Sequence, residues 1–309
     1  MKQALSKIAL SLGFIAAATA FNVAQAATLV ATTSTNQLYT FDSANVGGGT
    51  LIGINGLLSG ESFVGIDLRP TNNTIYGITS ANNLYTLDAS TGFASLIAGL
   101  SNTGINNFSI QSGVSYGVDF NPVADRTAPV SFRVVSSTGD NVAVNATTGV
   151  VSVQKSIAKD FSAIAYSNSD STTPTVNPGN TQLYYLNAET DTLSIATTAF
   201  NNPSISLISK IGINILSSNG FEIFNQNGIN TGFAAVDIQQ NKNKIESLFL
   251  GIDLITGEAS NLGKFKFDGT LTGLAAAPSA VPVPAALPLM ASALGLFCLS
   301  RRKNKASTV

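Results

Sequence analysis

Residues 83–92 read Asn83-Leu84-Tyr85-Thr86-Leu87-Asp88-Ala89-Ser90-Thr91-Gly92, and their first part repeats the pattern of Gln37-Leu38-Tyr39-Thr40-Phe41-Asp42. Looser copies follow at Asn141–Gly149 and Leu250–Gly257. Each copy alternates apolar and polar residues and ends in residues that favour tight turns, which indicates a short β-strand followed by a hairpin. A unit that recurs about every 40 to 50 residues and holds four such strands is typical of a propeller blade.

A second element recurs ahead of the first. Gly65-Ile66-Asp67-Leu68-Arg69-Pro70 and Gly117-Val118-Asp119-Phe120-Asn121-Pro122 match almost position by position, and Gly232–Ile238 is a looser relative. We assign these three segments to the innermost strands of three blades. Ala165 and Ala275 take the position of the aspartate in the other two blades.

The alternation continues through residues 27–278, so we predict an all-β propeller body. Five four-stranded blades are expected, with six blades or an irregular, open array as the alternative. The first strand, Thr28–Thr33, and the last, Leu271–Ala276, would pair in one blade and close the ring, which removes exposed strand edges. The last blade is poorly defined, because residues 239–244 leave little room for a strand. The strands expected in the three complete blades are Phe63–Leu68, Thr74–Thr79, Asn83–Asp88, Phe93–Ala98, Tyr116–Asn121, Phe132–Ser136, Val142–Asn145, Val150–Gln154, Ala163–Ser167, Leu183–Asn187, Thr192–Thr197 and Ile205–Ile211.

The composition excludes several kinds of chemistry. The 309 residues include no His, no Trp and one Cys, and only 11% of them are charged. Without His there is no Ser-His-Asp triad and no His-ligated metal site, and one Cys leaves no disulfide within the chain. Gly113–Gly117 fits the G-x-S-x-G pattern of a hydrolase nucleophile elbow. Such an elbow needs a His partner and a following helix, whereas a strand is expected to follow here. We therefore assign no catalytic residue.

Residues 1–26 have the features of a cleaved secretory signal. Two lysines precede the apolar run Ile8–Phe21, and Ala24 and Ala26 form the small-x-small pattern that signal peptidase accepts. The run is too short to span a bilayer comfortably. We expect cleavage by signal peptidase and export across the inner membrane, with a retained membrane helix as the alternative.

Residues 279–309 place three features in order. Val281-Pro282-Val283-Pro284-Ala285-Ala286 leads into an apolar stretch, 285–300, that we predict to be a transmembrane helix, and a basic end with Arg301 and Arg302 follows. This order resembles the PEP-CTERM sorting signal of Gram-negative bacteria in its Val-Pro-x-Pro-Ala-Ala form. The resemblance implies cleavage by an exosortase, a membrane-embedded cysteine transpeptidase-like enzyme. Membrane contact would then occur only through this helix before sorting, and the product would reach the cell surface or the exterior. An ordinary C-terminal anchor is the alternative.

Blocks of the body resemble one known family. Besides the two Gly-x-Asp elements, they include Asn121-Pro122-Val123-Ala124-Asp125-Arg126 and Leu183-Tyr184-Tyr185-Leu186-Asn187. Over most of residues 29–276 the sequence is similar to an uncharacterised family of secreted bacterial domains, number four-three-nine-four among the domains of unknown function. The resemblance implies the architecture and an extracytoplasmic setting, but no activity. The insert at 127–132 departs from the family pattern and leaves the position of Asp125 and Arg126 open.

The charge of the body is acidic once the two ends are removed. Of the 16 basic residues, two lie in the signal and four in the C-terminal segment, which leaves ten, and all 17 carboxylates lie between Asp42 and Asp268. The body therefore carries 10 − 17 = −7. Nucleic acid and anionic membranes require a basic surface, so we do not expect them as partners. A divalent cation, a neutral glycan or another protein remains compatible.

The candidate site is the set of aspartates on the expected innermost strands. Asp67, Asp119 and Asp237 would converge on the central channel, with Arg69 and Asn121 on the same strand faces, because residues two apart share a face. Carboxylate oxygens suit calcium, so a calcium ion is the one cofactor left open. The alternative is that each aspartate accepts backbone N–H groups of a neighbouring blade or pairs with an arginine.

Two functions follow from these features. The first is an exported, non-enzymatic surface or extracellular matrix protein whose propeller binds a glycan, a peptide or another copy. The second is a secreted polysaccharide hydrolase or lyase that uses Asp67, Asp119 and Arg69, since two carboxylates suffice for glycoside cleavage. The recurring tyrosines, among them Tyr39 and Tyr85, are interpreted as packing between blades rather than as a platform for sugars.

Overall fold

The structure is a computed structural model that describes residues 26–103, 107–127, 130–173, 175–242, 244–267 and 269–278. The predicted signal cleavage site at Ala24, the sorting motif and the C-terminal helix therefore lie outside the described residues, apart from Ala26. Within the described part there is no helix long and apolar enough to cross a membrane. We refer to residues 27–278 as the body.

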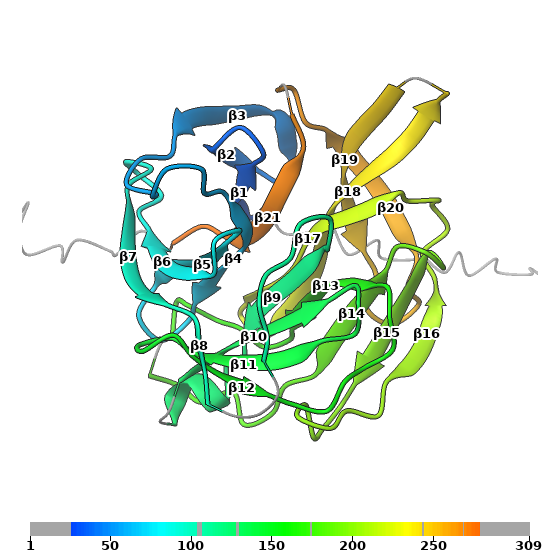
Figure 1. The fold of residues 1–309 in the computed structure, drawn as a ribbon. Coiled ribbons are helices and arrows are strands. Elements are labelled where there is room, and N and C mark those ends of the chain that lie inside the picture. The colour runs from blue at the N-terminus through cyan, green and yellow to red at the C-terminus, as the bar shows by residue number, and fades with distance from the viewer. Residues whose placement is uncertain are drawn as a thin grey trace, which may run out of the picture.

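The body consists of five antiparallel sheets arranged as a five-bladed β-propeller (Figure 1). The blades are numbered from the sheet that holds the first strand. The strands of each blade are given from the innermost outwards. Blade 1 contains β21 (Leu271–Ala276), β1 (Thr28–Thr33), β2 (Gln37–Asp42) and β3 (Asn45–Gly53), and blade 2 contains β4 (Phe63–Arg69), β5 (Thr74–Thr79), β6 (Asn83–Leu87) and β7 (Ala94–Gly99). Blade 3 contains β9 (Tyr116–Phe120), β10 (Ser131–Ser136), β11 (Asn141–Asn145), β12 (Val150–Val153) and an added parallel strand, β8 (Ser101–Asn102). Blade 4 contains β13 (Phe161–Tyr166), β14 (Leu183–Asn187), β15 (Thr192–Ala196) and β16 (Ser206–Lys210), and blade 5 contains β17 (Ser217–Gln226), β18 (Ile229–Asn241), β19 (Lys244–Ile252) and β20 (Ala259–Lys264).

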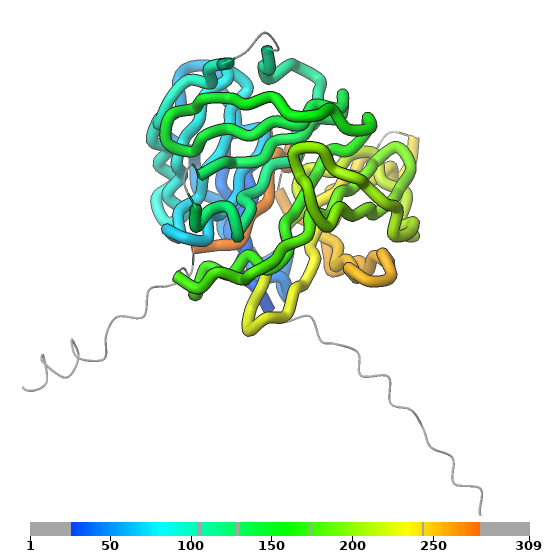
Figure 2. Tube along the Cα trace, turned by 90° about the horizontal axis from the view of Figure 1, so that it is seen from below, coloured from blue at the N-terminus to red at the C-terminus, as the bar shows by residue number. Residues whose placement is uncertain are grey.

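The predicted closure of the ring is confirmed. β1 pairs with β2 on one side and with β21 on the other, with Val30 opposite Ala275 and Ala31 opposite Leu274. The orange β21 lies beside the blue N-terminal strands in both views of the chain (Figures 1 and 2). Since the two strands come from opposite ends of the body, their hydrogen bonds hold the ring shut without a disulfide.

The fifth blade differs from the sequence prediction. Its innermost strand is β17, and the segment Gly232–Ile238, which we had assigned to an innermost strand, lies in the second strand, β18. A tight turn at Asn227-Gly228 joins the two, and both residues have the positive φ, 53° and 80°, that a two-residue hairpin needs. Residues 239–244, which had seemed to exclude a strand, form the end of the long β18–β19 hairpin.

The core is divided among the five junctions between blades. Each of five clusters of buried apolar side chains within the described residues joins two neighbouring blades. Between blades 1 and 2, for example, Leu38 packs with Ile66 and Tyr85. The tyrosines of the repeat are buried, with Tyr39 at 2% and Tyr85 at 0% exposure, so the prediction that they pack between blades is confirmed.

Small residues on the innermost strands allow five strands to meet around the axis. Gly65, Gly117, Ala163, Gly220 and Gly273 occupy equivalent positions, two residues before the level of the buried acids. A Cβ atom on Gly117 would lie 2.7 Å from the Cα of Ala163 and from the N of Ile164 in the next blade, which is closer than van der Waals contact. These close approaches set the narrow radius of the ring.

Candidate functional site

Three carboxyl groups lie next to one another at the axis of the propeller. Asp67 on β4 and Asp119 on β9 stand on innermost strands, as predicted, and the third group is Glu222 on β17. Each accepts a backbone N–H from the next blade: Asp67 Oδ2 from Phe120 at 2.7 Å, Asp119 Oδ2 from Tyr166 at 3.2 Å, and Glu222 Oε2 from Ala276 at 2.9 Å. The alternative interpretation of the sequence, acceptors of neighbouring N–H groups, thus describes the contacts of Asp67 and Asp119.

Asp237 does not belong to this cluster. It lies on β18, where Oδ2 accepts hydrogen bonds from the Ser217 hydroxyl at 3.1 Å and from the Asn219 amide at 2.7 Å. Its other oxygen accepts the Ser247 hydroxyl. The expected position of Asp237 on an innermost strand is therefore wrong, because the Asn227-Gly228 turn adds a strand ahead of it. The sequence signal for the true third acid is Gly220-Phe221-Glu222, which repeats the Gly-x-acid spacing.

The axial acids are held in an environment that disfavours their charge. All three are buried, at 4% exposure or less. Burial raises the pKa of Glu222 to about 7, and burial together with the carboxylate of Glu222 raises the pKa of Asp67 well above its usual range. Burial, followed by the charges of Asp67 and Glu222, likewise raises the pKa of Asp119. Asp67 and Glu222 share a hydrogen bond, so a proton held between them relieves their repulsion.

Arg69 and Asn121 lie where their strands end and take part in local structure. Arg69 Nε donates to Asp125 Oδ1 at 2.7 Å, and Asp125 Oδ2 accepts the backbone N–H of Thr71 at 3.1 Å. This ion pair links blade 2 to the turn that follows β9 in blade 3. Asn121 Oδ1 accepts the N–H groups of Val123 and Ala124 at 3.0 Å and shapes the same turn. Neither side chain is paired with the axial acids in these contacts.

The described residues contain no group of three or more His, Cys, Asp or Glu arranged to hold a metal ion. The axial acids come nearest to such a group in composition, and one of their oxygens, Asp119 Oδ1, is buried without a hydrogen-bond partner. Two alanines, Ala165 and Ala275, take the remaining positions of that level, and the three acids accept backbone N–H groups from neighbouring blades. It does not face solvent, so a polymeric substrate does not reach these carboxylates in this conformation.

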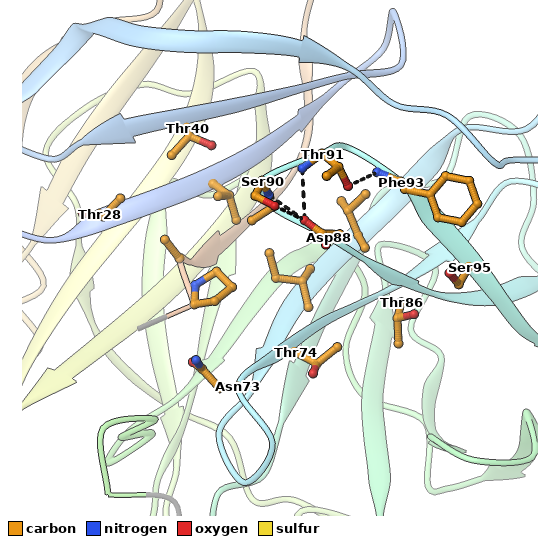
Figure 3. A pocket seen from close by; sticks show the side chains of 16 residues that line it. Thr28, Thr40, Asn73, Thr74, Thr86, Asp88, Ser90, Thr91, Phe93 and Ser95 are labelled. Atoms are coloured by element: carbon orange, nitrogen blue, oxygen red, sulfur yellow. Dashed lines mark hydrogen bonds between the residues drawn. The ribbon is translucent and has the colours of Figure 1, made fainter. Parts of the chain in front are cut away.

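A groove of about 750 Å³ lies between blades 1 and 2 and opens to solvent (Figure 3). Its position was not predicted, because its lining comes from segments that are far apart in the sequence. The lining residues are Thr28, Val30, Thr40, Asn73, Thr74, Ile75, Thr86, Leu87, Asp88, Ala89, Ser90, Thr91, Phe93, Ser95, Ala277 and Pro278. The volume falls within the range of small-molecule sites, about 300 to 1,000 Å³.

The polar lining of the groove is almost uncharged. Among the described residues that line it, Asp88 is the one with a charge. Asp88 Oδ1 accepts hydrogen bonds from the backbone N–H of Ser90 at 2.8 Å, the Ser90 hydroxyl at 2.6 Å and the N–H of Thr91 at 3.0 Å (Figure 3). These bonds, led by the Ser90 hydroxyl, lower the pKa of Asp88. The turn is a repeat feature, since Asp253 Oδ1 accepts the equivalent N–H groups of Ile255 and Thr256 in blade 5.

The sequence matches the family described as Domain of unknown function (DUF4394) over residues 37–275, so the chain belongs to this family. No curated protein matches the sequence. Among solved structures, the calcium-binding protein regucalcin from Agrobacterium tumefaciens strain C58 is similar with a TM-score of 0.40 and 13% identity, over 79% of this chain and 72% of that chain. A structural genomics protein of unknown function from Bacteroides thetaiotaomicron VPI-5482 is similar with a TM-score of 0.44 and 11% identity, over 75% of this chain and 56% of that chain. Neither similarity bears on the function of this chain.

Proposed function

We propose that this member of the DUF4394 family is an exported surface or extracellular matrix protein whose propeller binds a ligand without converting it. The observation that carries the proposal is the contrast between the two candidate sites. The carboxylates best suited to catalysis are buried at the axis and bonded to backbone N–H groups, whereas the solvent-open groove is lined mainly by uncharged hydroxyls. Its described lining holds one carboxylate, Asp88, and not the pair that glycoside cleavage uses. Hydroxyls of this kind donate and accept hydrogen bonds but supply no acid or base near neutral pH.

Export and sorting form the second part of the proposal. The signal-like residues 1–26 direct the chain to signal peptidase, and the motif Val281–Ala286 with Arg301 and Arg302 directs it to an exosortase. The test is cell fractionation of the full chain carrying a tag inserted in an exposed loop of the body. We expect a processed, surface or released product, and a variant with Pro282→Ala and Pro284→Ala that stays in the inner membrane. Unprocessed wild-type chain in the cytoplasm would contradict export.

Binding without turnover is tested with the purified body, which contains every strand and every apolar cluster that the structure describes. Extracellular polysaccharide from a producing culture is incubated with the body, and bound protein and newly formed chain ends are both measured. We expect retention on the polysaccharide and no new ends. New ends that disappear in Asp119→Asn would instead support the alternative, a hydrolase or lyase that uses carboxylates.

Calcium remains a separate proposal at Asp67 and Asp119, whose oxygens are of the type that calcium binds. Its test is the melting temperature of the body with and without millimolar calcium. A rise that disappears in Asp67→Ala would support it, and an unchanged melting temperature would reject it.

A further inference from the structure

The groove between blades 1 and 2 lies at the seam where the ring closes. In the other blades a chain segment joins the innermost strand to the second strand at this end, as residues 70–73 do in blade 2. In blade 1 these two strands, β21 and β1, come from opposite ends of the body, so no direct connection of this kind joins them. The backbone N–H of Ala277 donates to the carbonyl of Thr28 at 2.9 Å, and both residues line the groove. The cavity is therefore a consequence of ring closure.

The groove offers hydrogen-bonding groups that the protein itself does not use. Within the described residues no hydrogen bond engages the hydroxyls of four lining residues, and none engages the second oxygen of Asp88, Oδ2. Two of these hydroxyls, on Thr28 and Thr40 of blade 1, lie on the same sheet face as Val30 and face blade 2. The other two, on Thr86 and Ser95, lie on the opposite face of the blade 2 sheet from Leu87. The unused hydroxyls between the two blades are therefore those of Thr28 and Thr40, and the pairing of β1 with β2 fixes the positions of their Cα atoms. Such groups bind water in the free protein and can exchange it for the hydroxyls of a ligand.

Apolar surface lies next to these hydroxyls. Val30, Ile75 and Leu87 lie beneath the groove and are covered, at 2% exposure or less. The apolar groups that solvent reaches are the ring of Phe93, which is 54% exposed (Figure 3), and the half-buried Ala89 and Ala277. A sugar ring presents hydroxyl groups at its edge and C–H groups on its faces. A surface that alternates hydroxyls with aliphatic and aromatic groups complements both.

We infer that this groove binds a neutral glycan chain, an inference that rests on the proposed function of ligand binding without turnover. An extended peptide fits less well, because β1, β2 and β6 are each paired on both edges and offer it no free backbone groups. A phosphorylated or strongly acidic ligand is disfavoured, since the lining residues that the structure describes include one carboxylate and no cation.

The test uses neutral oligosaccharides of glucose and of mannose, two to six residues long, titrated into the body by calorimetry. The groove variant is the double substitution Thr28→Ala and Thr40→Ala, which removes two unused hydroxyls. Its matched control is Thr50→Ala, because Thr50 lies directly opposite Thr40 on β3 but does not line the groove. A second pair is Phe93→Ala with Leu96→Ala as control, both exposed side chains near or on β7. Melting curves establish that each variant is folded.

We expect the double threonine variant to bind about 10-fold more weakly, which corresponds to about 1.4 kcal/mol, because two hydrogen bonds to the ligand are lost. Phe93→Ala should weaken binding as well, and the two controls should bind like the wild type. Binding that is unchanged in both groove variants would overturn the site and leave the proposed function standing. No binding of any neutral oligosaccharide would overturn the ligand class. A body extended to Ala286 that fails to bind would show that the chain's own continuation fills the groove, and would also overturn the inference.

Discussion

Replacing Glu222 by Gln removes one of the three carboxyls that meet at the axis while it preserves the shape of the side chain. The amide oxygen can still accept the N–H of Ala276, and the amide nitrogen can donate to Asp67. The glutamine side chain is uncharged at every pH. The substitution therefore reports what the ionisation of Glu222, including its repulsion of Asp67 and Asp119, contributes to stability.

The sign follows from the direction of the pKa shift. The pKa of Glu222 is about 7 in the folded protein and 4.5 in a freely hydrated chain, so the folded state holds the proton more tightly. Its contribution to stability is fully present below pH 4.5 and is lost as the pH rises through about 7. The difference of about 2.5 pH units corresponds to about 3 kcal/mol, or about 6 to 12 °C in Tm for a domain of this size.

The assay is the free energy of unfolding in urea, measured from pH 4 to 9 for both proteins. Subtracting the two profiles removes the carboxylates away from the axis, including Asp88 and Asp253, whose lowered pKa values act in the opposite direction. The difference reports Glu222 together with Asp67 and Asp119, because, besides burial, the charge of Glu222 raises the pKa values of the two aspartates. From pH 4 to 9 we expect the free energy of unfolding of Glu222→Gln to rise by about 3 kcal/mol relative to that of the wild type. Most of this rise should occur between pH 4.5 and 7. The control Glu189→Gln changes an exposed carboxylate and should leave the profile parallel to the wild type. Parallel profiles for Glu222→Gln would refute a buried, proton-holding cluster.

Two further substitutions test the packing around the axis and between blades. Gly117→Ala should destabilise the body by about 1 to 3 kcal/mol, because the new Cβ would lie 2.7 Å from the backbone of the next blade. The matched control is Gly53→Ala, where nothing lies within 4 Å of the new Cβ. Equal urea midpoints for the two variants would contradict the close approach at Gly117. Tyr85→Phe should lower the free energy of unfolding by about 1 to 3 kcal/mol, because the Tyr85 hydroxyl donates to the buried Glu61 Oε2 at 2.7 Å. Tyr184→Phe should have a smaller effect, because the Tyr184 hydroxyl donates to Gln182 near the surface. The reverse order of the two effects would show that the Glu61 contact is not stabilising.

Strand alternation and the repeat were enough to predict five blades, because both are local patterns. The seam could be predicted because the first strand, Thr28–Thr33, and the last, Leu271–Ala276, each read as one strand of an incomplete blade. Thr28–Thr33, Thr74–Thr79, Leu183–Asn187 and Leu271–Ala276 have the expected bounds, and the other expected strands of the complete blades differ by one or two residues at an end. The fifth blade was misassigned because Gly232–Ile238 imitates an innermost strand. The decisive signal was the Asn227-Gly228 turn, whose two residues adopt positive φ in a tight hairpin.

The axial site could be predicted only in part, and the groove not at all. Asp67 and Asp119 were found from their common spacing after a glycine, and the same spacing identifies Glu222 once β17 is recognised. The pairing of Arg69 with Asp125 depends on how blades 2 and 3 are placed, which the sequence does not reveal. The groove depends on Thr28 and Ala277 meeting at the seam, a contact between residues at opposite ends of the body.

Ring closure by the two ends of the body is tested most directly with paired cysteines in the body, which has no cysteine of its own. Val30 and Ala275 lie opposite each other on antiparallel strands, where the Cα separation suits a disulfide. The variant Val30→Cys with Ala275→Cys should form one intramolecular disulfide under mild oxidation. The variant Val30→Cys with Leu274→Cys should not, because neighbouring residues of a strand point to opposite faces. Equal crosslinking of both variants, or none in either, would contradict a ring closed by β1 and β21.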